Sequence, residues 1–152
     1  MIRVQRDDFD LGAELERLSA GRRDVGALCS FVGLVRDLND GAGVSAMTLE
    51  HYPGMTEKQL EHLEAEARQR WLLDDVLVIH RYGRLEPGDR IMLCAVTSGH
   101  RQAAFEACQF LMDWLKTKAP FWKLEEHAGE TRWVEARASD DDAAARWVES
   151  DG

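Results

Sequence analysis

The stretch from residue 76 to residue 97 decides the fold of this chain. It contains Val76-Leu-Val-Ile-His-Arg-Tyr82, then Glu86-Pro-Gly-Asp89, then Ile91-Met-Leu-Cys-Ala-Val-Thr97. Proline presets φ and glycine accepts positive φ, so the middle segment predicts a turn. The apolar runs on either side predict two strands that pair with each other.

Further strands and helices are predicted on both sides of this pair. Upstream, we expect strands at 2–5, 25–35 and 44–50, a Gly- and Asx-rich loop at 37–43, and a helix that carries Leu11, Leu15 and Leu18 and ends near Gly21. A second helix follows, with Thr56 and Gln59 as a capping box and an apolar stripe of Leu60, Leu63, Ala67 and Trp71.

A third helix is expected from about Arg101 to Thr117, ended by Pro120, and a closing hairpin from Phe121–His127 and Thr131–Ala136. The core side of this helix is expected to carry Ala104, Phe105, Cys108, Leu111, Met112 and Leu115. Strands and helices mixed through hairpin connections favour an α+β fold, a mixed and mainly antiparallel sheet with packed helices.

Length and charge limit the class of protein. The 152 residues suit one domain, 1–152, with 139–152 as an acidic tail that holds a short helix. The 28 acidic and 19 basic side chains give a net charge of -9, which argues against a nucleic-acid partner. No apolar segment approaches the ~20 residues of a membrane span, and the N-terminus lacks the apolar core of a signal peptide. We therefore expect a cytoplasmic protein without a membrane partner.

Cysteine and histidine spacing gives no sign of a metal site. Cys29, Cys94 and Cys108 lie far apart among apolar neighbours, which is typical of buried thiols in a reducing compartment. The five histidines show no ligand spacing either. We therefore expect no metal site.

Three basic sites remain as candidates for chemistry. The run Lys116-Thr-Lys-Ala-Pro-Phe-Trp-Lys123 places three amines within eight residues of an acidic chain. Neighbouring amines disfavour each other's protonation, so a partly desolvated lysine can act as a base or nucleophile. Alternatively, the first two lysines merely complement the negative end of the helix dipole.

The other two sites are Arg36, after a strand, and Ser98-Gly-His-Arg101, before a helix. Arginine at such a junction can hold phosphate or carboxylate, and a helix N-terminus attracts anions. The alternatives are a solvated strand end for Arg36, and for the second site an N-cap serine beside an arginine that points into water. Together the three sites suggest a phosphate-bearing substrate and a reactive lysine, without naming a reaction.

Five motifs in order resemble a known family, the large, catalytic subunit of molybdopterin synthase. They are Phe31-Val-Gly-Leu-Val-Arg36, Leu49-Glu-His-Tyr-Pro-Gly-Met55, Ile79-His-Arg-Tyr-Gly83, Val96-Thr-Ser-Gly-His-Arg101 and Phe110-Leu-Met-Asp-Trp-Leu-Lys-Thr-Lys-Ala-Pro-Phe-Trp-Lys123. The resemblance extends to Arg132-Trp-Val-Glu-Ala-Arg137 and so spans nearly the whole chain.

The resemblance implies an α/β hammerhead-like fold, a homodimer of large subunits, and a heterotetramer with two small ubiquitin-like sulfur-carrier subunits. The carrier's Gly-Gly tail, a thiocarboxylate, would enter a pocket on the large subunit. Its sulfur would pass to cyclic pyranopterin monophosphate and form the molybdopterin dithiolene. No metal or redox cofactor is implied.

Carried over by motif, Lys116 and Lys123 would be catalytic, with Lys116 as acid/base or transient acyl acceptor. The substrate would be bound by Arg36, His100 and Arg101 through its phosphate, with help across the dimer interface, and by Leu34, Val35, Leu124 and Glu125. Leu34 departs from family members that carry a basic residue there. Two other hypotheses remain open: a module that only docks a ubiquitin-like partner, and a phosphoester-processing enzyme.

Overall fold

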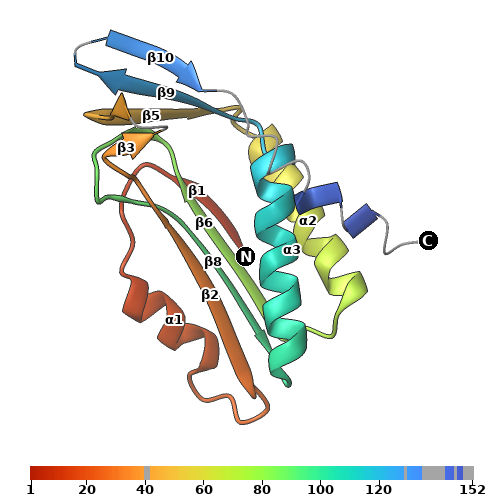
Figure 1. The fold of residues 1–152 in the computed structure, drawn as a ribbon. Coiled ribbons are helices and arrows are strands. Elements are labelled where there is room, and N and C mark those ends of the chain that lie inside the picture. Colours follow the sequence, from red (N-terminus) through yellow and green to blue (C-terminus); the bar gives the residue numbers. More distant parts are fainter. Residues whose placement is uncertain (40–41, 129, 135–142, 146, 149–152) are drawn as a thin grey trace.

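A large and a small sheet, each of four strands, organise the molecule (Figure 1). This computed structural model describes residues 1–39, 42–128, 130–134, 143–145 and 147–148. The large sheet has the order β1 (Ile2–Gln5), β6 (Asp75–Arg81), β8 (Arg90–Ser98) and β2 (Ala27–Leu34). The small sheet has the order β10 (Glu130–Val134), β9 (Phe121–His127), β5 (Ala46–His51) and β7 (Gly83–Leu85).

The pairing of β6 with β8 confirms the central prediction. The two strands are antiparallel, with Val78 opposite Cys94. Only β1 and β6 run parallel within the large sheet, and the small sheet is antiparallel throughout. The predicted α+β class with mainly antiparallel strands is therefore confirmed.

The connection between β6 and β8 differs from a simple hairpin. At Gly83, with φ of 90°, the chain leaves the large sheet, and β7 pairs with β5 before β8 returns. This three-residue strand is too short to show a period-2 pattern, so the sequence did not predict it. Residues 37–43, expected as a loop, include a two-residue pairing of β3 (Leu38–Asn39) with β4 (Ala42–Gly43). The predicted closing hairpin is confirmed, with Glu130 opposite His127.

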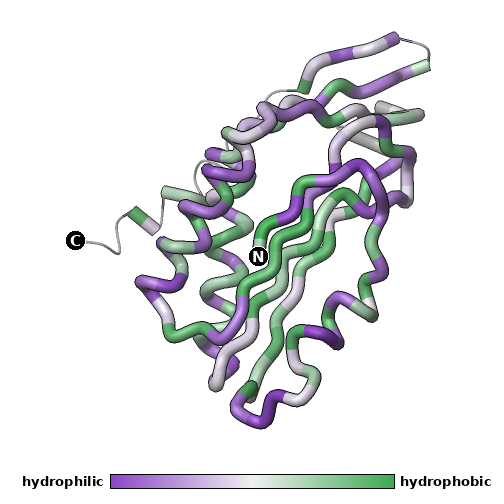
Figure 2. Tube along the Cα trace, turned by 180° about the vertical axis from the view of Figure 1, so that it is seen from behind, coloured by the Kyte–Doolittle hydropathy of each residue, from purple (hydrophilic) through white to green (hydrophobic). Residues whose placement is uncertain are grey.

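Helices cover both faces of the large sheet. Helix α1 (Leu11–Ser19) lies on one face, and α2 (Met55–Arg70) and α3 (Arg101–Lys118) lie on the other (Figure 1). Successive residues of a strand face opposite sides, so Val76 and Val78 pack toward α2 and α3 while Leu77 and Ile79 pack toward α1. The central strands are correspondingly apolar along their length in Figure 2.

The start of α2 corrects the predicted capping box. The N-cap is Gly54, whose N–H donates to Glu57 Oε2 at 2.7 Å. Thr56 is buried inside the helix, and its hydroxyl donates to the Tyr52 carbonyl. The predicted pair of Thr56 and Gln59 is therefore wrong. A glutamate at the third helical position does cap the helix, as Glu57 bonds to Gly54. The helix begins two residues earlier than the apolar stripe indicates.

The core face of α3 agrees with the prediction at Ala104, Cys108, Leu111 and Leu115 but differs at the phenylalanines. Phe105, expected in the core, is 63% exposed, whereas Phe110 is fully buried. Phe110 packs edge-on against Trp71, at 5.4 Å between ring centroids, and against Trp147, at 5.6 Å. Helix α3 contacts α2 as well as the sheet, and this second contact brings Phe110 into the core.

The C-terminal segment returns to the same helix. Residues 143–145 and 147–148 are helical, and the Trp147 indole N–H donates to Asp113 Oδ2 at 2.7 Å. This agrees with the short helix expected near the end of the chain. The three aspartates at 140–142 lie outside the described residues.

Replacing Phe110 by Ala should cost about 3–5 kcal/mol of unfolding free energy, because a fully buried ring is lost and a cavity remains. Phe105→Ala, on the same helix, should change stability by less than about 0.5 kcal/mol. Urea unfolding followed by tryptophan fluorescence measures both. Equal effects of the two substitutions would contradict the observed orientation of α3.

Candidate active site

The path of α3 brings the lysine run and Arg36 to one end of the large sheet. The helix starts just after β8 ends, packs back along β8, and finishes near the level where β8 begins (Figure 1). Strand β2 ends at this same level, because Leu34 pairs with Arg90. Lys116, in the last turn of α3, therefore lies at the end of the sheet that carries Arg36.

Pro120 separates the two candidate catalytic lysines. Lys116 is exposed, while Lys123 is half-buried in β9, where it lies opposite Leu49 of β5. Only Ala119 and Pro120 connect the end of α3 to the start of β9, so both lysines are held close to one bend. The third amine, on Lys118, lies 4.6 Å over the Trp114 ring instead.

A cluster of aromatic rings underlies this bend. His80 of β6 is 5% exposed and stacks on Phe121, with 3.8 Å between centroids. Burial lowers the pKa of His80 to about 4; the contact with the Arg81 carbonyl opposes this, and the charges of Lys116 and His51 add to it. The sequence placed His80 in a motif but gave it no role. Its position inside an otherwise apolar strand was the available signal in the sequence.

Arg36 is held in place through its neighbour. A register shift between Gly33 and Leu34 bends the end of β2. Val35 is then buried, donating its N–H to the Asp89 carbonyl at 2.9 Å and accepting from Gly88 at 2.8 Å. A surface pocket of about 620 Å³ opens here, lined by Val35, Arg36, Asp37, Pro87 and Gly88. Leu34 is 55% exposed beside it.

Leu124 and Glu125 lie on opposite faces of β9. Glu125 is on the same face as Lys123, is 5% exposed, and lies 3.4 Å from His127 Nε2. Leu124 is on the other face, opposite Thr48 and Trp133. Glu125 is therefore on the lysine side of the sheet and Leu124 is not.

His100 and Arg101 lie at the opposite end of the molecule from the lysines. Both are exposed at the start of α3, so about 22 Å of helix separates Arg101 from Lys116. The predicted alternative of a Ser98 cap is not realised, because Ser98 Oγ donates to the Leu72 carbonyl and His100 is the N-cap. One chain therefore brings Arg36 and the lysines to one end but leaves His100 and Arg101 at the other.

The turn before His100 is fixed by a close backbone approach. Gly26 donates its N–H to the Ser98 carbonyl at 3.0 Å. A Cβ atom at residue 26 would lie 2.1 Å from the Gly99 carbonyl oxygen, well inside contact distance. Only glycine at residue 26 allows this approach, which places His100 and Arg101 beside the start of β2.

Three cations of the candidate site have no carboxylate partner among the described residues. Among the described residues, no ion pair involves Arg36, Arg101 or Lys116. Several other arginines are paired with carboxylates, as Arg22 is with Asp24 at 2.9 Å and Arg84 with Glu86 at 3.0 Å. Cations without carboxylate partners are available to an anionic ligand.

Residues 4–118 match the MoaE protein family. The chain belongs to the MoaE family. It is 62% identical over 146 residues to the molybdopterin synthase catalytic subunit of Ralstonia nicotianae, covering 96% of this chain and 83% of that protein.

Similar solved structures include MoaE proteins. The molybdopterin biosynthesis MoaE protein of Burkholderia ambifaria is 55% identical, with a TM-score of 0.83 over 97% of both chains. A chain from the Helicobacter pylori complex of subunits 1 and 2 of molybdopterin-converting factor has a TM-score of 0.74 over 90% of this chain and 91% of its own. At 21% identity, that likeness shows the fold alone.

Metal and membrane features are not found in the part of this MoaE chain that the structure describes. No group of three or more His, Cys, Asp or Glu side chains there could hold a metal ion. No helix among these residues is long and apolar enough to cross a membrane.

Two cysteines of this MoaE protein, Cys29 and Cys108, have raised pKa values that make them poor nucleophiles. Cys94 and Cys108 are buried and Cys29 is half-buried, as expected for thiols packed in a core. Burial raises the pKa of Cys29 to about 11, and Cys108 adds to the effect. The pKa of Cys108 is also raised, first by its contact with Cys94 and then by burial.

Alkylation of Cys29 by iodoacetamide at pH 8 should be about 100-fold slower than that of a free thiol, because the raised pKa leaves little thiolate. The rate should rise with pH toward about 11, the pKa of this thiol. Mass spectrometry of the intact protein measures it. Rapid single-site modification at neutral pH would show instead that a reactive thiolate is present.

Proposed function

We propose that this chain is the catalytic subunit of a molybdopterin synthase. It transfers sulfur from the thiocarboxylated C-terminus of a small ubiquitin-like carrier subunit to cyclic pyranopterin monophosphate, forming the molybdopterin dithiolene. The observation that carries the proposal is the pair Lys116 and Lys123, held at one bend in a chain of the MoaE family.

The chemistry requires local positive charge in an acidic protein. The thiocarboxylate, the cyclic phosphate and the oxyanions that develop during transfer are all negative, and preorganised cations stabilise them. Lys116 serves as acid/base or transient acyl acceptor, and Lys123 supplies further donors. Arg36 binds the phosphate beside Val35, and Glu125 borders the site on the Lys123 face of β9.

Lys116→Ala should lower dithiolene formation by at least ~100-fold, because the group that moves the proton or takes the acyl chain is gone. Binding of the carrier should be largely retained. The assay combines the protein with thiocarboxylated carrier and precursor and measures the dithiolene product.

The matched control is Lys118→Ala, which removes an amine two residues away that lies over Trp114. This variant should keep most of the activity. Near-normal turnover by Lys116→Ala would refute its role. Carrier binding by the wild-type chain without any product would favour a docking module over an enzyme.

A homodimer would complete the phosphate site. Strand β2 is an edge of the large sheet, and Leu28, Phe31 and Leu34 are exposed along it. Two copies of this edge related by a two-fold axis would run antiparallel. The start of β2 in the partner copy, which lies beside its own Gly99, would then meet the end of β2 that leads to Arg36.

This pairing brings the partner subunit's His100 and the partner subunit's Arg101 to the lysines of the first chain. Their separation of about 22 Å within one chain then agrees with a phosphate role for both. Each of the two sites in the dimer is built from two subunits. A carrier on each large subunit makes the heterotetramer.

Mixed dimers test this arrangement. Lys116→Ala and Arg101→Ala homodimers should each be weak, the second mainly in precursor affinity. A dimer with one subunit of each kind contains one site with both residues intact. Random mixing should therefore restore about one quarter of wild-type activity, since half of the dimers are mixed and each has one good site of two.

Absence of any recovery, with subunit exchange verified by mass spectrometry, would place Arg101 and Lys116 of one chain in the same site or exclude Arg101 from it. Two Lys116→Ala preparations mixed together provide the control for exchange alone.

The carrier and the location complete the proposal. Relatives are named catalytic subunits, which implies at least one further subunit in each of those enzymes. The extended Gly-Gly tail of the carrier would reach the lysines at the exposed end of α3, where β9 begins. Three free cysteines agree with a reducing, cytoplasmic location.

A further inference from the structure

His80 occupies an unusual position for a titratable residue. It lies near the end of β6 on the face that packs toward α3, between Val4 of β1 and Met92 of β8. Its Nδ1 lies 2.8 Å from the Arg81 carbonyl oxygen. A carbonyl can only accept, so Nδ1 carries the proton and the ring orientation is fixed.

One face of this ring is covered by Phe121. The two rings are nearly parallel, at 18° with 3.8 Å between centroids. Strand β6 belongs to the large sheet and β9 to the small one, so this stack is a direct contact between the two sheets. Phe121 is also the first residue after the Ala119–Pro120 bend and shares a face of β9 with Lys123.

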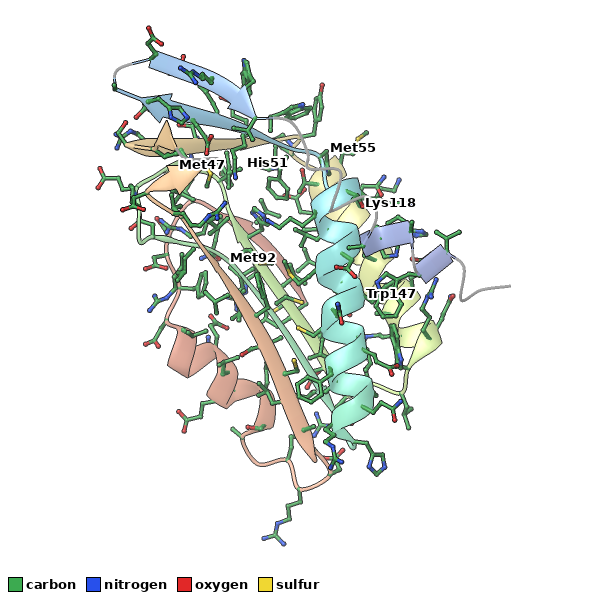
Figure 3. All side chains as sticks on the ribbon, in the orientation of Figure 1. Met47, His51, Met55, Met92, Lys118 and Trp147 are labelled. Atoms are coloured by element: carbon green, nitrogen blue, oxygen red, sulfur yellow. The ribbon has the colours of Figure 1, made fainter. Side chains whose placement is uncertain are left out.

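His51 supports the same ring from β5. Its ring lies 6.0 Å from Phe121 and 4.5 Å from Tyr82, and its Nδ1 lies 3.1 Å from Thr56 Oγ1. The Thr56 hydroxyl donates to Tyr52, so its oxygen accepts from His51. Phe121 is therefore held by two imidazoles whose orientations are each fixed by a hydrogen bond. Figure 3 labels His51 in the space between the small sheet and α3.

Burial is the main reason that the His80 ring stays neutral, and the charges around it act in the same direction. Lys116 from α3 and His51 from β5 both lower its pKa, while its sheet neighbours Val4 and Met92 carry no charge. A neutral ring can stack closely on Phe121 beside the Lys116 ammonium, whereas an imidazolium there would repel that ammonium.

We propose that His80 is a positioning residue for sulfur transfer: its ring fixes Phe121, and thereby the placement of Lys123 relative to Lys116. The reaction named here rests on the proposed function, while the geometric claim stands independently of it. His80 itself does not need to contact substrate. Displacing the reacting groups by about 1 Å can cost 100-fold in rate, so a fixed bend between the lysines matters for turnover.

Three substitutions separate the ring face from the other properties of His80. His80→Phe keeps an aromatic face and loses the nitrogens. His80→Asn keeps a donor for the Arg81 carbonyl and loses the ring, and His80→Ala loses both. We expect kcat to fall about 10- to 100-fold in His80→Asn and His80→Ala, with carrier affinity unchanged, and to be largely retained in His80→Phe.

Val78→Ala is the matched control for stability. Val78 is buried on the same face of β6, two residues from His80, and packs in the core below α3. It should lower the unfolding midpoint without lowering kcat. Normal kcat in His80→Ala, equal losses in His80→Phe and His80→Ala, or an equal loss in Val78→Ala would each overturn the proposal.

Lysine labelling gives a readout that needs no catalysis. Acetylation rates of Lys116 and Lys123, measured by mass spectrometry of peptides, should change in His80→Asn and His80→Ala but not in His80→Phe, with Lys58 on α2 as reference. If the wild-type chain makes no dithiolene, the proposed function fails and labelling alone decides the role of His80. Unchanged labelling in every variant would overturn that role even if turnover falls.

Discussion

The direct passage from α3 into β9 is the constraint on which the rest of the structure depends. Pro120 prevents the helix from continuing, and β9 begins at the next residue. A helix that packs along the large sheet therefore leads directly into β9, an inner strand of the small sheet. The two lysines, the Phe121 stack and the half-buried face of β9 all follow from this connection.

Much of the fold could be predicted from the sequence because its signals are local. The β6 and β8 strands, the Pro-Gly turn and the closing hairpin depend on alternation and on turn residues. The errors arose where contacts with another helix or strand determine which residue is buried or caps a helix. Phe105 and Phe110 both lie near the apolar stripe of α3, and only the contact with α2 determines which one is buried. The capping residue of α2 likewise depends on how the chain arrives from β5.

The sequence predicted the individual residues of the candidate site but not how they are arranged in space. Arg36 and the lysines do share one end of the sheet, because β2 and α3 both end there. His100 and Arg101 cannot join them within one chain, since a helix of 18 residues intervenes. Sequence motifs carry no information on whether their members come from one subunit or two. His80 was overlooked for a related reason: a histidine in an apolar strand resembles a core residue until its ring partner is known.

The contact between Gly26 and Gly99 constrains the evolution of this protein far from the lysines. Because any side chain at residue 26 collides with backbone rather than with a flexible group, no compensating change in a neighbouring side chain can relieve it. Variation at this position requires the whole β8–α3 turn to move. The path of the main chain beneath His100 is thus fixed by residue 26, whatever side chains surround it.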